Sequence, residues 1–290
     1  MTADTRPSVR ADCETEPMGT LVCLHAHPDD EAISTGGTMA RASAEGHRVV
    51  LIVATDGAVG ETPDDLGDQN LVDRRRAETM ASAAALGIHR VAWLGYADSG
   101  MTGWEQNDDP DSFHQAPVEE AAEKVADILR EEDADVFTIY DWHGTYGHPD
   151  HVKVHTVGRR AGELVDSVRV LQATANRDAM KQMIDAARES GVDVGPTDGD
   201  DEFDPTGPAD DGNPFGEPES DITLCVDIGE FVTAKKEALR AHSSQVDESS
   251  FFMQMPDEVF RQAFGREWYI EDDATPPYRT GWIFDPVPSS

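Results

Sequence analysis

The chain has 290 residues, with 23 Lys and Arg against 58 Asp and Glu, which gives a formal net charge of −35. This length suits one large domain or two small ones. The excess of acid argues against binding to duplex nucleic acid or to anionic membranes, because basic side chains recognise both partners. It leaves a cytosolic enzyme, a cation-binding protein or a protein adapted to high salt.

The N-terminal segment carries no targeting or membrane signal. Residues 1–17 are polar and lack the apolar core of a secretory signal, so we predict that they form a disordered extension. No run of the sequence approaches the ~20 apolar residues of a membrane span. The three cysteines are widely spaced, and we expect reduced thiols in a cytoplasmic protein.

Short apolar runs alternate with amphipathic segments of helical length, which is typical of an α/β fold. In chain order, the predicted strands lie at residues 20–24, 49–55, 91–94, 136–140, 168–173 and 222–226. The predicted helices lie at residues 31–45, 70–86, 118–132, 151–164, 176–189 and 230–241. The expected architecture is a Rossmann-like, mainly parallel sheet flanked by helices, with a smaller C-terminal subregion.

One long segment differs from the rest in composition. Residues 189–234 contain no Lys or Arg and are dense in Asp, Glu, Gly and Pro. Such a segment buries little apolar surface, so we predict a mobile acidic insertion at about residues 193–221. Residues 18–290 are otherwise expected to form a single domain.

The first segment with a chemical signature is His27-Pro28-Asp29-Asp30, where the first predicted strand ends and the next helix begins. Open α/β sheets bind ligands at the carboxyl ends of their strands. The two acids could simply cap the helix. A histidine close to adjacent acids also suits Zn²⁺ or Fe²⁺, which accept imidazole and carboxylate ligands.

The second segment is His148-Pro149-Asp150-His151, which follows the strand predicted at residues 136–140. Two His-Pro-Asp sequences at two strand ends favour a metal site over a purely structural histidine. Two histidines and one carboxylate also form the metal triad of non-haem Fe(II) oxygenases, so this class of enzyme stays as a more distant alternative.

Together these segments resemble the zinc-dependent LmbE-like (PIG-L) de-N-acetylases. The resemblance is closest to the actinobacterial branch that contains the mycothiol-biosynthesis deacetylase and the mycothiol S-conjugate amidase. It extends over most of residues 18–270 and is carried by residues 26–31, 75–78, 98–101, 146–151 and 238–245. The two His-Pro-Asp motifs are highly diagnostic of the family, and the other three motifs are supporting.

The resemblance implies a metal centre with a general base. His27, Asp30 and His151 would bind Zn²⁺, with Fe²⁺ as the alternative, and would leave one position for water. Asp29 would be the general base that takes a proton from this water.

The resemblance also implies roles for the surrounding side chains. His148 would be protonated, stabilise the oxyanion and protonate the leaving amine, and Asp150 would keep it cationic. Tyr146 would line the site. Arg75 and Asp98 would hold hydroxyl groups of the substrate sugar.

The implied function is a metal-dependent hydrolase that removes the acetyl group from an N-acetylglucosamine-type small molecule. An amidase that acts on thiol–sugar conjugates uses the same chemistry and stays open. The chain departs from the family at Trp142-His143-Gly144-Thr145 and in its acidic insertion. We therefore assign no role to His143 and leave the group attached to the sugar open. No nucleic-acid or membrane partner is expected, and a homo-oligomer stays open.

Overall fold

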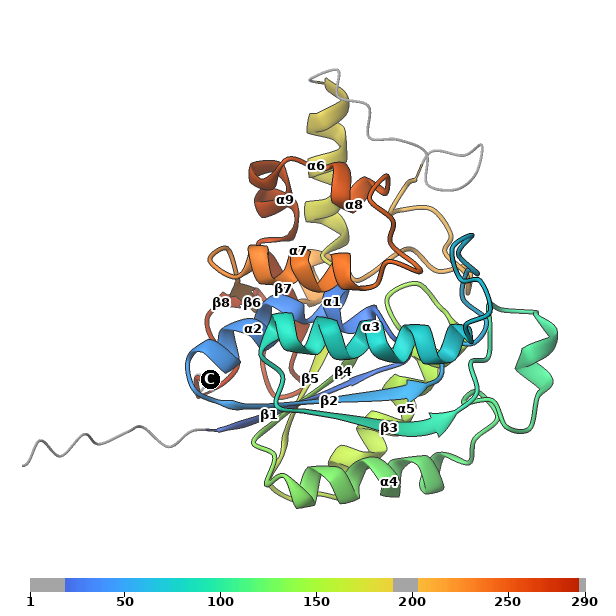
Figure 1. Ribbon diagram of the computed structural model, residues 1–290. Coiled ribbons are helices and arrows are strands. Elements are labelled where there is room, and N and C mark those ends of the chain that lie inside the picture. Colours follow the sequence, from blue (N-terminus) through green and yellow to red (C-terminus); the bar gives the residue numbers. More distant parts are fainter. Residues whose placement is uncertain (1–18, 190–202, 287–290) are drawn as a thin grey trace, which may run out of the picture.

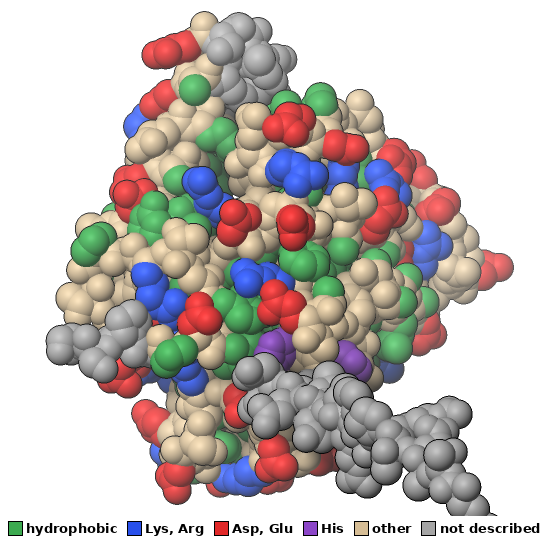
Figure 2. Space-filling view, turned by 90° about the vertical axis from the view of Figure 1, so that its left-hand side faces the viewer, with side chains coloured by type: hydrophobic (Ala, Val, Ile, Leu, Met, Phe, Trp, Pro, Cys, Tyr) green, Lys and Arg blue, Asp and Glu red, His purple; other side chains and the backbone are tan. Residues whose placement is uncertain are grey.

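The computed structural model describes residues 19–189 and 203–286. The predicted N-terminal extension and residues 193–202 of the predicted insertion lie outside these ranges. Within the described residues, no helix is both long enough and apolar enough to cross a membrane. On the face drawn in Figure 2, Lys and Arg side chains are interspersed with Asp and Glu.

An eight-stranded sheet forms the centre of the molecule, in the order β3-β2-β1-β4-β5-β7-β6-β8 (Figure 1). The strands are β1 (Thr20–His25), β2 (Arg48–Thr55), β3 (Arg90–Tyr96), β4 (Val136–Tyr140), β5 (Arg169–Thr174), β6 (Leu224–Asp227), β7 (Arg266–Ile270) and β8 (Arg279–Thr280). The first five strands pair in parallel, whereas β7 is antiparallel to β5 and to β6. The predicted α/β fold with a mainly parallel sheet is confirmed.

Helices cover both faces of the sheet (Figure 1). They are α1 (Asp30–Ser34), α2 (Gly36–Ala44), α3 (Leu71–Leu86), α4 (Val118–Glu131), α5 (Pro149–Glu163), α6 (Arg177–Glu189), α7 (Val232–Ala241), α8 (Phe251–Gln254) and α9 (Asp257–Phe264). On β1, Leu21 and Cys23 pack in the core with α2, α3 and α7, whereas Val22 and Leu24 pack with α4 and α5. A strand buried on both faces explains its continuous apolar sequence.

The single helix predicted at residues 31–45 is wrong, because the chain forms α1 and α2 with a break at Thr35. Thr35 has non-helical backbone angles, and its hydroxyl group is hydrogen-bonded to His25 at 2.8 Å. The amides of Gly37 and Thr38, in the first turn of α2, donate to the buried carboxylate of Glu267 at 2.8 Å each. A distant strand therefore supplies the N-terminal cap of α2, which no local pattern could indicate.

The described part of the predicted insertion lies against the loop that follows β4. The amide of Asp210 donates to the carbonyl of Tyr146 at 2.9 Å, and the amide of Gly216 donates to that of Thr145 at 2.6 Å. The mobility of the insertion stays a prediction.

The chain order of the strands creates one crossover point. From β1 the chain proceeds outward through β2 to β3, and it then returns to place β4 on the other side of β1. Between two such strands, the connections leave in opposite directions and open a crevice at the carboxyl edge. The loops after β1 and β4, which contain both His-Pro-Asp motifs, lie at this edge of the sheet.

Candidate active site

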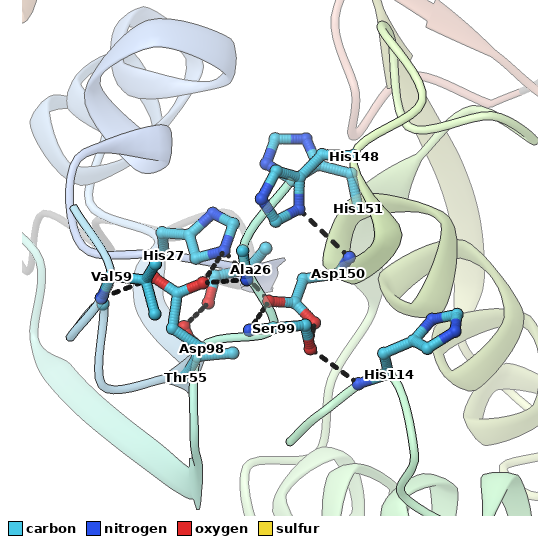
Figure 3. A network of polar contacts seen from close by, with 12 residues as sticks. Ala26, His27, Thr55, Val59, Asp98, Ser99, His114, His148, Asp150 and His151 are labelled. Atoms are coloured by element: carbon cyan, nitrogen blue, oxygen red, sulfur yellow. Dashed lines mark hydrogen bonds and ion pairs between the residues drawn. The ribbon is translucent and has the colours of Figure 1, made fainter. Parts of the chain in front are cut away.

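The two predicted motif loops come together at the crossover point, because β1 and β4 are parallel neighbours and end at the same edge. The first motif provides His27, and the second provides His148 and His151 (Figure 3). Asp30, from the first motif, begins α1. All four side chains are buried.

The three predicted metal ligands converge on one carboxylate oxygen. Oδ2 of Asp30 lies 3.3 Å from Nδ1 of His27 and 3.4 Å from Nε2 of His151. Two ligands that are each ~2.1 Å from a tetrahedral Zn²⁺ are separated by ~3.4 Å, so these spacings suit a bound ion. Asp30 thus lies close to both predicted histidines. Within the described residues, the donor sets of this site whose atoms all lie within 4.8 Å of one another are His27, His148 and His151, and His27, Asp98, His148 and Asp150. Metal binding by His27, Asp30 and His151 stays a prediction.

Hydrogen bonds on the far side of each imidazole set its orientation. Nε2 of His27 donates to Asp150 at 3.1 Å, and Nδ1 of His151 donates to the carbonyl of Gly144 at 3.2 Å. The other nitrogen of each ring faces Asp30. A carboxylate or carbonyl behind a metal-binding histidine is the usual arrangement in metal sites.

Charge in the cluster also favours a cation. Burial by itself lowers the pKa of His27, but the carboxylates of Asp98, Asp150 and Asp30 raise it well above its usual value. Burial raises the pKa of Asp30, but His151 and His27 lower it well below its usual value. An imidazole surrounded by ionised carboxylates is an environment that attracts a positive ion.

Asp29 is held in an unusual backbone conformation beside the cluster. Its φ of 114° lies in a region that residues other than glycine rarely adopt, and its amide donates to Glu31 at 3.0 Å. Strain of this kind persists only where surrounding contacts enforce it, and it is concentrated at functional sites. Burial raises the pKa of Asp29 to about 6, although the Arg75 guanidinium acts in the opposite direction.

Arg75 has a set of partners that its predicted role did not include. Its side chain is buried and donates to the carbonyls of Gly57 at 2.7 Å and Pro28 at 2.6 Å, and to the carboxylate of Asp29 at 3.0 Å. These bonds connect α3 to the loop that contains Asp29. Contact between Arg75 and a sugar stays a prediction.

The predicted pairing of His148 with the carboxylate of Asp150 is wrong. Oδ2 of Asp150 accepts hydrogen bonds from His27 and from the amide of Ser99 at 2.9 Å, and its Oδ1 accepts one from the Ser99 hydroxyl. The hydrogen bond between Asp150 and His148 comes from the backbone amide of Asp150, which donates to Nδ1 at 3.1 Å (Figure 3), although the Asp150 carboxylate also lies within 4.8 Å of a nitrogen of the His148 ring. The sequence indicated that these residues are close but not which atoms meet.

The structure also contradicts a protonated His148. Burial, together with the nearby His27 and His151 rings, lowers the pKa of His148 to about 3. The ring is therefore neutral near pH 7. Because Nδ1 accepts the Asp150 amide proton, the proton of the neutral ring is on Nε2.

The two remaining predicted residues border the same cluster. Oδ1 of Asp98 lies 3.6 Å from Nε2 of His27, and the hydroxyl of Tyr146 lies 3.4 Å from Nε2 of His151. Burial raises the pKa of Tyr146, so the phenol keeps its proton. Every residue predicted for the site thus lies in or directly beside it.

Three further side chains support the site and were not predicted to do so. They are Ser99, Glu31 and His242, and the last two are fully buried and 2.6 Å apart. All three lie within the sequence motifs that carry the family resemblance, which was the available signal. Their contacts join segments more than 50 residues apart, so their roles depend on the fold.

Solved structures of deacetylases have the same fold. N,N'-diacetylchitobiose deacetylase from Pyrococcus horikoshii matches with a TM-score of 0.54 and 21% identity, over 87% of this chain and 83% of that one. A deacetylase in the biosynthesis pathway of teicoplanin matches with a TM-score of 0.55 and 19% identity, over 88% and 100% of the two chains.

Sequence comparison identifies closer relatives. Two proteins described as 1D-myo-inositol 2-acetamido-2-deoxy-alpha-D-glucopyranoside deacetylase are 38% and 39% identical to this chain. The first, from Acidothermus cellulolyticus, covers 86% of this chain and 87% of its own, and the second, from Thermomonospora curvata, covers 86% and 89%. The model of the PIG-L family, GlcNAc-PI de-N-acetylase, matches residues 22–162, which contain both His-Pro-Asp motifs. The chain belongs to the PIG-L family of de-N-acetylases.

Proposed function

We propose that this protein is a metal-dependent hydrolase that removes the acetyl group from 1D-myo-inositol 2-acetamido-2-deoxy-α-D-glucopyranoside. The observation that carries the proposal is the position of Asp29, a carboxylate with a raised pKa, directly beside a His/Asp/His cluster. The relatives with this activity in their names support the choice of substrate.

His27, Asp30 and His151 would hold the metal. Two imidazoles and a carboxylate suit Zn²⁺ first and Fe²⁺ second. When bound, such an ion lowers the pKa of water and polarises the amide carbonyl.

Asp29 acts as the general base in this proposal. Its Oδ2 accepts the hydrogen bond from Arg75, which leaves Oδ1 to take the proton from the attacking water. A carboxylate with a pKa of about 6 is ionised at neutral pH yet is a stronger base than an ordinary aspartate. After the water oxygen bonds to the acetyl carbon, the same proton passes to the nitrogen as the C–N bond breaks, which releases acetate and an amine.

His148 acts as a neutral hydrogen-bond donor. Since its Nδ1 is engaged by the amide of Asp150, its Nε2–H is available for the carbonyl oxygen as negative charge develops there. Tyr146, whose phenol keeps its proton, is near enough to the cluster to provide a second donor.

Two adjacent substitutions separate the base from the metal ligand. Asp29→Asn should keep the metal and lower kcat by roughly 10²–10⁴-fold, the usual contribution of a general base. Asp30→Asn should lose both the metal and the activity. Asp73→Asn, at an exposed position on α3, serves as the control. An Asp29→Asn enzyme with an unchanged kcat would refute the proposed base.

The conjugate amidase is tested in the same experiment. A thiol–sugar conjugate is offered to the same enzyme preparation, and release of the free amine is measured for both compounds. The proposal predicts faster cleavage of the acetylated inositol glycoside. Faster cleavage of the conjugate would assign the protein to the amidase function.

A cytoplasmic location fits this activity and stays a prediction. Within the part of the chain that the structure describes, Cys23 and Cys225 are free thiols, as expected for a protein kept under reducing conditions.

A further inference from the structure

A second cluster of metal-binding side chains lies outside the proposed active site. Asp141, His143 and Glu217 are buried, and each offers a ligand atom within 4.8 Å of the other two. Asp141 and His143 follow β4, and Glu217 comes from the acidic segment. The proposed reaction uses none of the three.

The His143 ring faces oxygen atoms with both of its nitrogens. Nδ1 lies 3.4 Å from Oδ2 of Asp211 and has no hydrogen-bond partner. Nε2 lies 3.4 Å from the carbonyl oxygen of Gly216 and 3.9 Å from Oδ1 of Asp141. A neutral imidazole has one N–H, so one nitrogen must turn its lone pair toward an oxygen. A bound cation or a second proton removes this repulsion.

Glu217 has one carboxylate oxygen with the same lack of a hydrogen-bond partner. Its side chain belongs to a residue that is 7% exposed, and its Oε1 has no hydrogen-bond partner. Burial and the charge of Asp141 raise the pKa of Glu217. A buried carboxylate oxygen without a partner is costly unless it binds a proton or a metal.

The positive charge of Arg177 acts on Glu217, but among the described residues Arg177 forms no ion pair with the carboxylates of Asp141, Asp211 or Glu217. The Arg177 guanidinium donates to the backbone carbonyls of Phe215, at 2.8 Å, and of Gly216. The carboxylates of Asp141, Asp211 and Glu217 lie around a single imidazole. Asp141 accepts hydrogen bonds from the Thr174 hydroxyl and two backbone amides, but all of these donors are neutral, so the negative charge of the cluster favours a divalent cation.

The spacing of the donor atoms suits such an ion. Two ligands that are each ~2.1 Å from a metal are at most ~4.2 Å apart, and Nε2 of His143 is 3.9 Å from Oδ1 of Asp141. Asp211 lies behind the opposite nitrogen, as a carboxylate commonly does behind a metal-bound histidine.

We propose that Asp141, His143 and Glu217 form a second metal site, which takes a divalent transition-metal ion such as Zn²⁺ or Mn²⁺. One imidazole and two carboxylates are the ligand types that these ions accept, whereas Ca²⁺ prefers oxygen ligands alone. We assign the site a structural role, because the proposed reaction uses none of its three ligands. It joins the acidic segment to the loop that contains Tyr146 and precedes His148, in addition to the main-chain bonds between them.

Metal stoichiometry tests the proposal. The full-length wild type and the Asp30→Asn variant, which lacks an active-site ligand, are equilibrated with Zn²⁺ or Mn²⁺, freed of excess ion and analysed for metal per chain. We expect two ions in the wild type and one in Asp30→Asn. Adding Glu217→Gln or His143→Gln to Asp30→Asn should remove the remaining ion. His155→Gln is the control, since His155 is half-buried on α5 and bonds only to the Tyr140 carbonyl, at 3.0 Å.

Glu217→Gln is the sharpest substitution because glutamine has the shape of a protonated glutamate. If Glu217 simply holds a proton, Glu217→Gln leaves the stability unchanged. Added metal then shifts the melting temperatures of Asp30→Asn and of Asp30→Asn/Glu217→Gln equally. If Glu217 binds a metal, the added ion stabilises only Asp30→Asn. Failure of Asp30→Asn to bind an ion, or retention of its ion after Glu217→Gln is added, would overturn the proposal.

Discussion

The guanidinium of Arg75 donates a hydrogen bond to the carboxylate of Asp29 across 3.0 Å, beside the histidine cluster of the candidate active site. The two residues are 46 positions apart in the chain, and Arg75 also fixes the carbonyl that precedes Asp29, that of Pro28. Arg75 thus holds the proposed base in two ways, through the Asp29 carboxylate and through the backbone carbonyl next to it. It explains how Asp29 keeps a positive φ that its side chain disfavours.

Replacing Arg75 should therefore impair the base without removing the metal. We expect Arg75→Gln to lower kcat by roughly 10²-fold, the typical cost of displacing a reacting group by about an ångström, at unchanged metal content. Arg76→Gln is the matched control, because the neighbouring Arg76 is exposed and lies over the Trp93 ring. If Arg75 only binds the sugar, KM will rise at constant kcat.

Gly144 should control metal affinity through His151. Its φ is +67°, and a Cβ atom at this position would overlap the His151 side chain, which Gly144 also orients through its carbonyl. We expect Gly144→Ala to weaken metal binding by about 10–100-fold, as is usual for changes behind a metal ligand. Gly67→Ala controls for backbone strain alone, since Gly67 has a φ of +58° with no atom near its Cβ position. Equal metal affinity in the two variants would contradict this role.

A buried ion pair should contribute to folding stability. Nζ of Lys235 donates to Glu267 at 2.5 Å and to the carbonyl of Ile33 at 2.7 Å, and both charged side chains are 2% exposed. Lys235→Met leaves the carboxylate buried without its counter-charge, which typically costs about 3–5 kcal/mol. Urea unfolding should show this loss, whereas Lys236→Met, next to it and paired with the exposed Asp257, should change stability far less. Equal decreases in the free energy of unfolding for the two variants would show that the buried ion pair stabilises the fold no more than the exposed one.

The ion pairs of Glu132 should make stability depend on pH. Hydrogen bonds from Arg48 and Arg90 lower the pKa of Glu132 below its usual value of 4.5. As the pH falls, Glu132 therefore takes up a proton in the unfolded chain before it does so in the folded protein. The stabilisation from its ion pairs is complete above about pH 4.5 and is lost as the pH falls through the lowered pKa of the folded state. The difference in unfolding free energy between wild type and Glu132→Gln should shrink over this interval. Glu131→Gln, at a more exposed neighbour, should show a smaller difference at every pH.

The sequence contained most of the fold and placed the two His-Pro-Asp motifs correctly. Alternating apolar runs locate the first six strands within two residues, and both motifs lie at strand ends as expected. The ligand roles that the family resemblance implies for His27, Asp30 and His151 stay predictions. The C-terminal strands β7 and β8 were not predicted from the sequence. β7 enters the sheet between β5 and β6, so its pairing depends on residues far away in the chain.

Long-range contacts account for the two errors within the site. Asp150 was expected to pair with His148, two residues before it, yet its carboxylate binds Ser99 and His27. His148 was expected to be charged, but the degree of its burial depends on packing between the two loops. Local sequence indicates which chemical groups are available, and the fold decides which of them meet.

The most direct test is the reaction itself. Purified wild-type protein, loaded with Zn²⁺, is incubated with 1D-myo-inositol 2-acetamido-2-deoxy-α-D-glucopyranoside, and acetate and primary amine are measured together. Our account predicts one acetate and one amine for each substrate consumed, at a rate that Asp29→Asn lowers by roughly 10²–10⁴-fold. Absence of both products from the protein with its metal bound would contradict it.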